Sequence, residues 1–321
     1  MTSKHLVDPE LLPLLLLFQQ MPAFQFSPES LPVMRSAMQA ARARVSITLP
    51  DSVSVTERLI PGPAGAPMMR ALITQPKAAG RGRPGILHIH GGGYISGTSD
   101  MTLATDAAYA AQLGAVAVSI DYRLAPETPH PGPVEDCYAG LAWLHDHADE
   151  LGIDPTRIAI TGESAGGGLA AATVLLARDR AKFNVGFQHL IFPMLDDRTV
   201  TQTDPSPLLG EFVWTRELNR FGWAALLGHA PGIDGVSPYA APARADELRG
   251  LPPTFIACGA LDLFLEENLE YSRRLIRAGV PTEMHIYPGA PHGFMMVASA
   301  RVSEQFARDS MMAMRLGLGV S

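Results

Sequence analysis

A serine set between glycines, at residues 162–166, could supply the nucleophile of an acyl-transfer reaction. These residues read GESAG and lie between the apolar run RIAI and an alanine- and glycine-rich stretch of helical composition. Between a strand and a helix, this pattern is typical of a sharp turn that lifts the serine hydroxyl out of the backbone. The alternative is a glycine-rich helix start that Ser164 merely caps. We predict that Ser164 is the nucleophile.

Three consecutive glycines at residues 91–93 could bind the negative charge that such a reaction develops. They follow His90 in the sequence HGGGY, at the end of an apolar run. Glycines leave backbone N–H groups open to close approach by a tetrahedral oxygen. An ordinary turn or a phosphate loop is the alternative, but neither GxGxxG nor the Walker lysine occurs. The predicted donors are the N–H groups of Gly92, Gly93 and Ala165, with His90 orienting the loop.

A serine hydroxyl needs a base that takes its proton, and four histidines follow Ser164 in the chain. His292 lies in the loop PGAPHGF after an apolar run, where exposure suits a general base. His189 and His285 lie inside strand-like runs and are expected to pack in the core. His229 is expected at the surface. His292 is therefore the predicted base.

The base in turn needs a carboxylate that holds its tautomer. Asp262 follows the strand-like run TFIAC and the residues GAL, at a strand end where sites of α/β proteins form. The competing interpretation makes Asp262 the N-cap of the next helix. Asp196 and Asp197 follow another strand-like run and are rival acids. We predict Asp262.

The elements around these residues predict an α/β fold. Two β-like stretches come first, joined by the turn-forming run PGPAGAP, and are expected to pair antiparallel. Short apolar runs then alternate with helix-length segments, the pattern of a mostly parallel sheet with helices on both faces. The expected strands cover residues 53–60, 68–75, 86–90, 116–120, 158–161, 187–192, 254–258 and 284–287. The expected helices cover residues 101–113, 134–149, 165–179, 215–227 and 266–278, with one more after Ala300.

Five motifs together resemble the hormone-sensitive-lipase-like branch (bacterial family IV esterases) of the α/β-hydrolases. In chain order they read HGGGY, DYRLAPE, GESAGG, ALD and PHGF, and they extend from about residue 85 to residue 295. The resemblance implies an α/β-hydrolase fold, oxyanion donors in the glycine loop, and a triad of Ser164, Asp262 and His292. It also implies hydrolysis of short to medium acyl esters without a metal or cofactor. Two motifs depart from the commoner family forms: GESAG replaces GDSAG or GTSAG, and DLFLEE replaces DPLRDE.

The resemblance further implies a helical cap over the serine. Residues 1–45 are expected to form an N-terminal helical cap segment, and residues 46–321 the catalytic domain, with a cap insertion at about 196–230. The side chains expected to bind the substrate are Tyr94, Glu163, Phe212 and Trp214. Some relatives pair as homodimers, so a homodimer is an expectation of the same kind.

Composition narrows the class of protein. The 321 residues carry a formal net charge of -7, which disfavours nucleic acid as a partner. The partner that the resemblance implies is a small-molecule ester. The apolar run at residues 11–18 is shorter than the about 20 residues that span a bilayer, and Pro13 interrupts it. We therefore expect no stable membrane insertion and a cytoplasmic location. Cys137 and Cys258 are expected to be buried thiols.

Other functions could use the same residues. A lipase, or an amidase or peptidase, would share the triad, and a non-catalytic ligand receptor of the same fold would lack the histidine. The segment DYRLAPE could place a second carboxylate pair, but we expect Asp121, Arg123 and Glu127 to form a structural network at a strand end.

Overall fold

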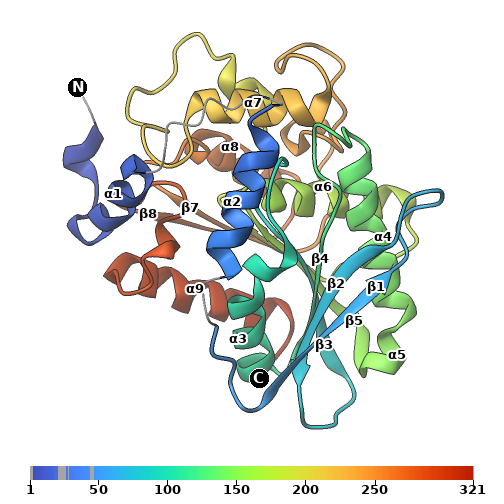
Figure 1. The fold of residues 1–321 in the computed structure, drawn as a ribbon. Helices are drawn as coiled ribbons and strands as arrows, with labels where there is room; N and C mark the ends of the chain where they lie inside the picture. Colours follow the sequence, from blue (N-terminus) through green and yellow to red (C-terminus); the bar gives the residue numbers. More distant parts are fainter. Residues whose placement is uncertain (1–2, 21–26, 28, 44–46, 321) are drawn as a thin grey trace.

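An eight-stranded sheet forms the centre of the molecule (Figure 1). The computed structural model describes residues 3–20, 27, 29–43 and 47–320. The strands lie side by side in the order β1-β2-β4-β3-β5-β6-β7-β8. Their bounds are β1 Val53–Ile60, β2 Met69–Pro76, β3 Arg83–Ile89, β4 Val116–Ile120, β5 Ile153–Glu163, β6 Phe187–Ile191, β7 Thr254–Gly259 and β8 Thr282–Tyr287.

The pairing confirms the predicted α/β architecture. β1 and β2 form an antiparallel pair, and β2 also lies antiparallel to β4. The six strands from β4 to β8 in this order pair in parallel. Most predicted strand ends lie within about three residues of the observed ones. β5 is the exception, because it begins five residues earlier than expected. Its first residues include the polar Asp154, Thr156 and Arg157, so they lack the apolar character by which the other strands were predicted.

Helices cover both faces of the sheet (Figure 1). α3 and α9 pack on one face, and α4, α6 and α8 pack on the other. All five residues of β4 are buried, as a strand covered on both faces requires. The helix bounds are α1 Leu12–Gln20, α2 Leu31–Ala43, α3 Leu103–Leu113, α4 Gly132–Asp146, α5 Ala148–Leu151, α6 Ala165–Arg180, α7 Arg216–Leu227, α8 Leu265–Arg277 and α9 Arg301–Gly317. Short 3-10 helices are η1 Ser3–Leu6, η2 Pro9–Leu11, η3 Ser99–Met101, η4 Asp197–Val200, η5 Pro242–Arg244 and η6 Phe294–Met296.

The N-terminal segment contacts the molecule at two separate places. α2 is held by Arg35, whose guanidinium donates to the carbonyls of Ile95 and Ala125 and pairs with Glu127. α1 packs near β8 and α9 (Figure 1), within an apolar cluster that includes Leu14, Tyr287 and Phe306. Residues 1–2, 21–26, 28, 44 and 45 of the expected cap segment lie outside the described residues.

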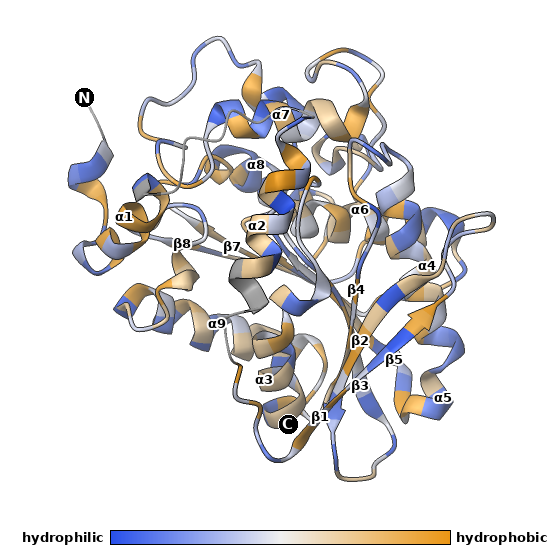
Figure 2. Ribbon diagram, in the orientation of Figure 1, coloured by the Kyte–Doolittle hydropathy of each residue, from blue (hydrophilic) through white to orange (hydrophobic). Residues whose placement is uncertain are grey.

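Two leucines of α1 are open to solvent. Figure 2 draws α1 largely in hydrophobic colours, and Leu16 and Leu17 are 52% and 51% exposed. α1 is nine residues long, and within the part of the chain that the structure describes no helix has the length and apolar character needed to cross a membrane.

The insertion between β6 and β7 contains α7 and two 3-10 helices, and its residues 193–253, all described, hold no strand, as predicted. Ser3 of η1 donates to the carboxylate of Glu211 in this insertion. The insertion is also anchored by a buried ion pair between Asp197 and Arg244. The two segments of the expected cap, the N-terminal segment and the insertion, therefore contact each other.

The DYRLAPE segment binds its surroundings differently from the expected network. Its three charged residues do not pair with one another: Asp121 accepts from Arg70, Arg123 pairs with the fully buried Asp136, and Glu127 pairs with Arg35. Glu127 is also largely exposed, with 58% of its side chain open to solvent. Each residue thus ties the end of β4 to a separate element, so the expected structural role is found, but the three residues do not form one network.

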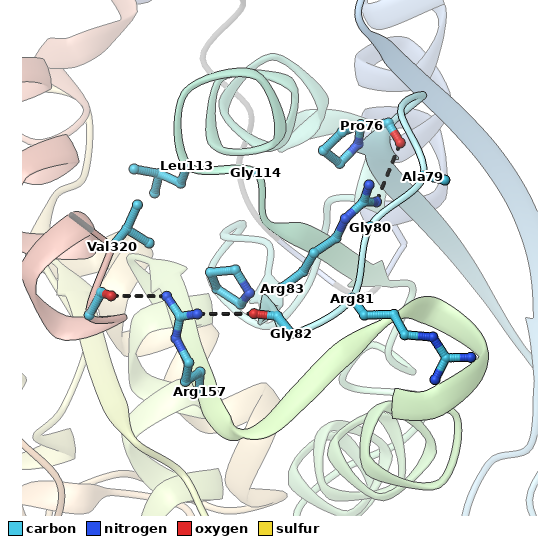
Figure 3. A pocket seen from close by; sticks show the side chains of 12 residues that line it. Pro76, Ala79, Gly80, Arg81, Gly82, Arg83, Leu113, Gly114, Arg157 and Val320 are labelled. Carbon is cyan, nitrogen blue, oxygen red and sulfur yellow. Dashed lines mark hydrogen bonds between the residues drawn. The ribbon is translucent and has the colours of Figure 1, made fainter.

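A hollow of about 460 Å³ lies at the far edge of the sheet, where the parallel strands begin (Figure 3). Arg83, the first residue of β3, lines it, and Arg157 of β5 donates there to the carbonyls of Gly82, Leu318 and Gly319. Seven residues of β3 separate this hollow from the glycine loop, about 20 Å along the strand. The residues of this hollow therefore hold the end of α9, and the glycine loop and Ser164 lie at the opposite edge of the sheet.

Candidate active site

Ser164 occupies a strained turn between β5 and α6. Its backbone has φ 57 and ψ -122, a conformation that a non-glycine residue adopts only under tertiary constraint. The glycines on either side permit the close crossing, because a Cβ at Gly162 would overlap the carbonyl of Gly166. A Cβ at Gly166 would overlap the carbonyl of Ile89. The turn presents the serine at the N-terminus of α6, where the helix dipole favours negative charge.

The structure brings Ser164, His292 and Asp262 together in one chain of hydrogen bonds. Nε2 of His292 lies 3.0 Å from Oγ of Ser164, and Nδ1 of His292 lies 2.7 Å from Oδ2 of Asp262. Ser164 and His292 are each 7% exposed, and Asp262 is fully buried. The other oxygen of Asp262 accepts the backbone N–H of Phe264 at 2.9 Å, which fixes the carboxylate. This arrangement can transfer a proton from the serine to the imidazole.

The glycine loop supplies N–H groups beside the serine. Gly92 and Gly93 have φ values of 124 and 63, and a Cβ at Gly92 would overlap the backbone of Ser96. In the described part of the chain, the amides of Gly92, Gly93 and Ala165 donate to no acceptor. Three free donors next to a nucleophile can bind an oxygen that becomes negative.

His90 lies behind this loop and does not reach Ser164 through a hydrogen bond. Its Nδ1 lies 2.8 Å from the carbonyl of Gly91, and its ring stacks on Tyr122 at 4.3 Å. Burial lowers the pKa of His90, so the ring is neutral at neutral pH. His90 therefore holds the loop by packing and by one hydrogen bond.

Aromatic rings surround the imidazole of His292. Phe192 and Phe264 meet it edge to face, with centroids 4.6 and 5.2 Å away, and the Trp214 ring lies at 6.3 Å. Phe192 follows β6, Phe264 precedes α8, and Trp214 comes from the insertion. Sequence analysis missed Phe192 and Phe264, although each stands within two residues of a strand end or a predicted site residue.

Trp214 also contacts the glycine loop. Its ring fills the space that a Cβ on Gly93 would take, and its indole N–H donates to Oδ1 of Asn219 at 3.1 Å. Gly222 of α7 approaches Gly93 as well, because a Cβ there would lie 2.8 Å from the Gly93 carbonyl. The insertion thus packs directly on the predicted oxyanion loop.

The other predicted substrate-binding residues lie elsewhere. Tyr94 is fully buried and its hydroxyl donates to the carbonyl of Met194 at 2.9 Å, so it supports the loop from below and presents no surface to a ligand. Glu163 directs its carboxylate to Nε2 of His88, 2.9 Å away. Phe212 is partly buried and packs against the apolar cluster on the α3 and α9 face. The expectation of direct substrate contact is corrected for Tyr94, whose φ of 67 turns the side chain into the core.

The rival histidines have other partners. His189 is buried between Thr161 and Ser310, and burial lowers its pKa to about 3. His285 binds Glu283, and His229 is exposed and contacts the carbonyl of the next residue. None of these rings has a hydrogen bond to Ser164.

The rival acids are also engaged elsewhere. Asp196 binds Arg198, and Asp197 is buried with Arg244. Nearby, the buried Glu267 of α8 accepts the backbone N–H of Leu195, and burial raises its pKa well above the usual range. Sequence analysis missed Glu267, whose signal was its position five residues after Asp262. Among the described residues, no group of three or more His, Cys, Asp or Glu side chains could hold a metal ion.

Comparison with known proteins identifies relatives of the chain. A family model described as an alpha/beta hydrolase fold matches residues 86–296. Two Mycobacterium tuberculosis proteins, carboxylic ester hydrolase LipN and esterase LipI, are each 36% identical to the chain. The matches cover 76% and 75% of this chain, and 65% and 75% of those proteins. The solved structure of a bacterial heroin esterase superposes with a TM-score of 0.87 at 41% identity, covering 99% of both chains.

Proposed function

The chain belongs to the alpha/beta hydrolase fold family, in the hormone-sensitive-lipase-like branch with its carboxylic ester hydrolases, and from this premise we propose that it is a serine carboxylesterase acting on short to medium acyl esters. The single observation that carries the proposal is the Ser164, His292 and Asp262 chain, with its 3.0 and 2.7 Å contacts.

The reaction proceeds through an acyl-enzyme. Oγ of Ser164 attacks the ester carbonyl carbon while Nε2 of His292 accepts the hydroxyl proton. His292 then donates that proton to the leaving alcohol oxygen, and the serine ester remains. A water molecule repeats the attack with His292 as base, which releases the acid and restores the serine. Asp262 holds the Nδ1–H tautomer and stabilises the imidazolium.

The glycine loop binds the charged oxygen of each tetrahedral intermediate. The amides of Gly92, Gly93 and Ala165 are the donors, and their unpaired state in the described residues supports this role. Such donors already point at the place where charge develops, so little reorganisation opposes the reaction.

The aromatic surroundings of His292 support the proposed preference for short to medium acyl groups. Trp214, Phe192 and Phe264 crowd His292, so bulky groups meet rings close to the reacting atoms. We place the cap in the N-terminal segment of residues 1–45 and in the insertion of residues 196–230, with Trp214 as its contact to the substrate. The 41% identity to a solved bacterial heroin esterase supports a small-molecule ester as the substrate class. The homodimer and the cytoplasmic location stay predictions.

A chain-length series of p-nitrophenyl esters, from acetyl to palmitoyl, tests the proposal. The wild type should turn over short chains fastest, and Ser164→Ala should lose at least about 10⁴-fold in kcat. Faster cleavage of emulsified long-chain triacylglycerol would favour a lipase, and faster cleavage of a matched anilide than its ester would favour an amidase. Binding without turnover in the wild type would indicate a receptor.

A further inference from the structure

Three charged side chains form a buried row next to the serine turn. The imidazole of His88, on β3, lies between two carboxylates: Nδ1 is 2.6 Å from Oδ1 of Asp106, and Nε2 is 2.9 Å from Oε1 of Glu163. His88 is fully buried, Asp106 is 1% exposed, and Glu163 is 17% exposed at its side chain. Charges removed from water to this degree persist only when they are paired and hydrogen-bonded.

The inner end of the row is held rigidly. Oδ2 of Asp106 accepts hydrogen bonds from the hydroxyls of Thr102 and Ser119, at 2.8 and 2.6 Å. Asp106 belongs to α3 and Ser119 to β4, so the row and its anchor join a helix to the three strands β3, β4 and β5. These two hydrogen bonds fix the orientation of the Asp106 carboxylate. The hydrogen bond from Asp106 in turn fixes the orientation of the His88 ring.

The outer end of the row reaches the reacting residues. Glu163 directly precedes Ser164, whose φ of 57 has to be maintained by its surroundings. The carbonyl of Glu163 lies against the glycine loop, since a Cβ at Gly91 would be 2.8 Å from it. His88 itself stands two residues before His90, at the end of the strand that leads into that loop. One imidazole therefore connects the serine turn with the oxyanion loop.

We propose that Glu163 is a positioning residue for Ser164, which it holds in register with the glycine loop through its hydrogen bond to His88 and the anchor at Asp106. The proposal rests on the proposed esterase function and goes beyond it. Glu163 does not touch the substrate in this role; it acts through the backbone it shares with the nucleophile.

Charge and side-chain length both support this role. Burial by itself would lower the pKa of His88. The charges and hydrogen bonds of Glu163 and Asp106 outweigh burial, and the pKa is raised to about 10. The ring is therefore an imidazolium at neutral pH and donates from both nitrogens, one to each carboxylate. The 2.9 Å contact needs the full length of a glutamate, since an aspartate at position 163 would hold its oxygens one methylene further back. The sequence GESAG in place of GDSAG thus has a structural counterpart in His88.

Variants at position 163 test the proposal. Glu163→Ala and Glu163→Asp should each lower kcat about tenfold to a hundredfold, the loss expected when reacting groups are misplaced by less than about 1 Å. KM should stay within about threefold of the wild-type value, because no substrate contact is removed. Glu163→Gln keeps an acceptor for Nε2 of His88 and should recover most of the loss. The acidic limb of the pH profile of kcat should keep its midpoint in all three variants.

Two controls make the outcome decisive. Ser310→Ala removes a buried hydrogen bond from His189 on the same face of the sheet, and should lower Tm without lowering kcat. Equal kcat losses in Ser310→Ala and Glu163→Ala would overturn the proposal, and so would an unchanged kcat in Glu163→Ala. A shifted midpoint of the acidic limb in the Glu163 variants would also overturn it, because that shift would indicate that Glu163 acts directly on His292. If Glu163→Ala does not fold, the comparison of kcat between Glu163→Asp and Glu163→Gln tests the proposal. Retained activity in Ser164→Ala would instead refute the esterase mechanism itself.

Discussion

The indole ring of Trp214 lies directly against the α-carbon of Gly93, so the inserted segment and the glycine loop share one surface. Residues 121 positions apart meet there, beside the imidazole of His292. The size of the site and the alignment of its N–H donors therefore depend on the same contact.

Gly93→Ala should remove most of the activity. The new methyl group would overlap the Trp214 ring, and φ 63 disfavours any side chain, so the loop has to move away from the oxyanion. We expect kcat to fall at least about a hundredfold, the effect of losing one oxyanion donor. Steady-state kinetics with p-nitrophenyl acetate measure it.

Gly114→Ala is the matched control for that substitution. Gly114 has nearly the same φ, 65, but nothing lies within 4 Å of its added Cβ. It should cost about 1 kcal/mol of stability and leave kcat unchanged. A comparable kcat loss in Gly114→Ala would contradict the role given to Gly93.

Trp214→Ala should broaden the acyl range. Removing the ring opens space next to Gly93 and His292, so kcat/KM should rise for octanoyl relative to acetyl esters. Trp214→Phe keeps a ring but loses the hydrogen bond to Asn219, and should shift the preference less. An unchanged chain-length profile in both variants would exclude Trp214 from the acyl site.

Asp262→Asn should separate the acid from its rivals. The amide keeps the size of the side chain but no longer holds the Nδ1–H tautomer of His292, so kcat should drop about 10⁴-fold. Asp196→Asn, whose carboxylate pairs with Arg198, should stay within a few-fold of the wild type. A larger loss of kcat in Asp196→Asn than in Asp262→Asn would indicate that Asp196 is the acid of the triad.

The stability of the protein should fall as pH rises through the weakly alkaline range. In the folded chain the pKa of His88 is about 10, above the about 6.5 of an exposed histidine. A raised folded-state pKa gives stability that is complete below pH 6.5 and is lost progressively as pH rises to about 10. Urea unfolding at pH 6.5, 8 and 9.5 measures the decline, which should be shallower in His88→Gln.

The difference between the pH dependence of stability in the wild type and in His88→Gln separates the contribution of His88 from that of other groups that titrate in the same range. The titratable side chains that face it are Asp106 and Tyr109 of α3, Glu163 of β5, His189 of β6 and His90 of the segment after β3. Parallel stability curves for the wild type and His88→Gln would show that His88 does not carry this dependence.

Sequence analysis predicted the fold class because the relevant signals are local. Each parallel strand is a short apolar run with its own turn, and Ser164 and Asp262 each come four residues after the end of such a run. Since parallel strands end at one edge of the sheet, residues 98 positions apart could be placed together without coordinates. His292 follows the next strand along the same edge.

The side-chain directions could not be predicted in the same way. Tyr94 sits in a motif that suggested ligand contact, yet it has a positive φ and its hydroxyl donates to the carbonyl of Met194 in the core. Glu163 was expected to bind substrate, and its partner His88 is 75 positions away. Phe192 and Phe264 gather around His292 only because three strand ends converge. Such contacts arise from tertiary packing, for which a local pattern has no signal.

Arg35 gives the N-terminal region a practical importance for anyone who shortens the chain for expression. Its guanidinium donates to the carbonyls of Ile95 and Ala125, in the segments that follow β3 and β4. A deletion ending after α2 would leave both carbonyls without this donor and uncover the loop that follows the three glycines. The helix is therefore needed to hold these two segments in place, and a shortened gene should begin upstream of it.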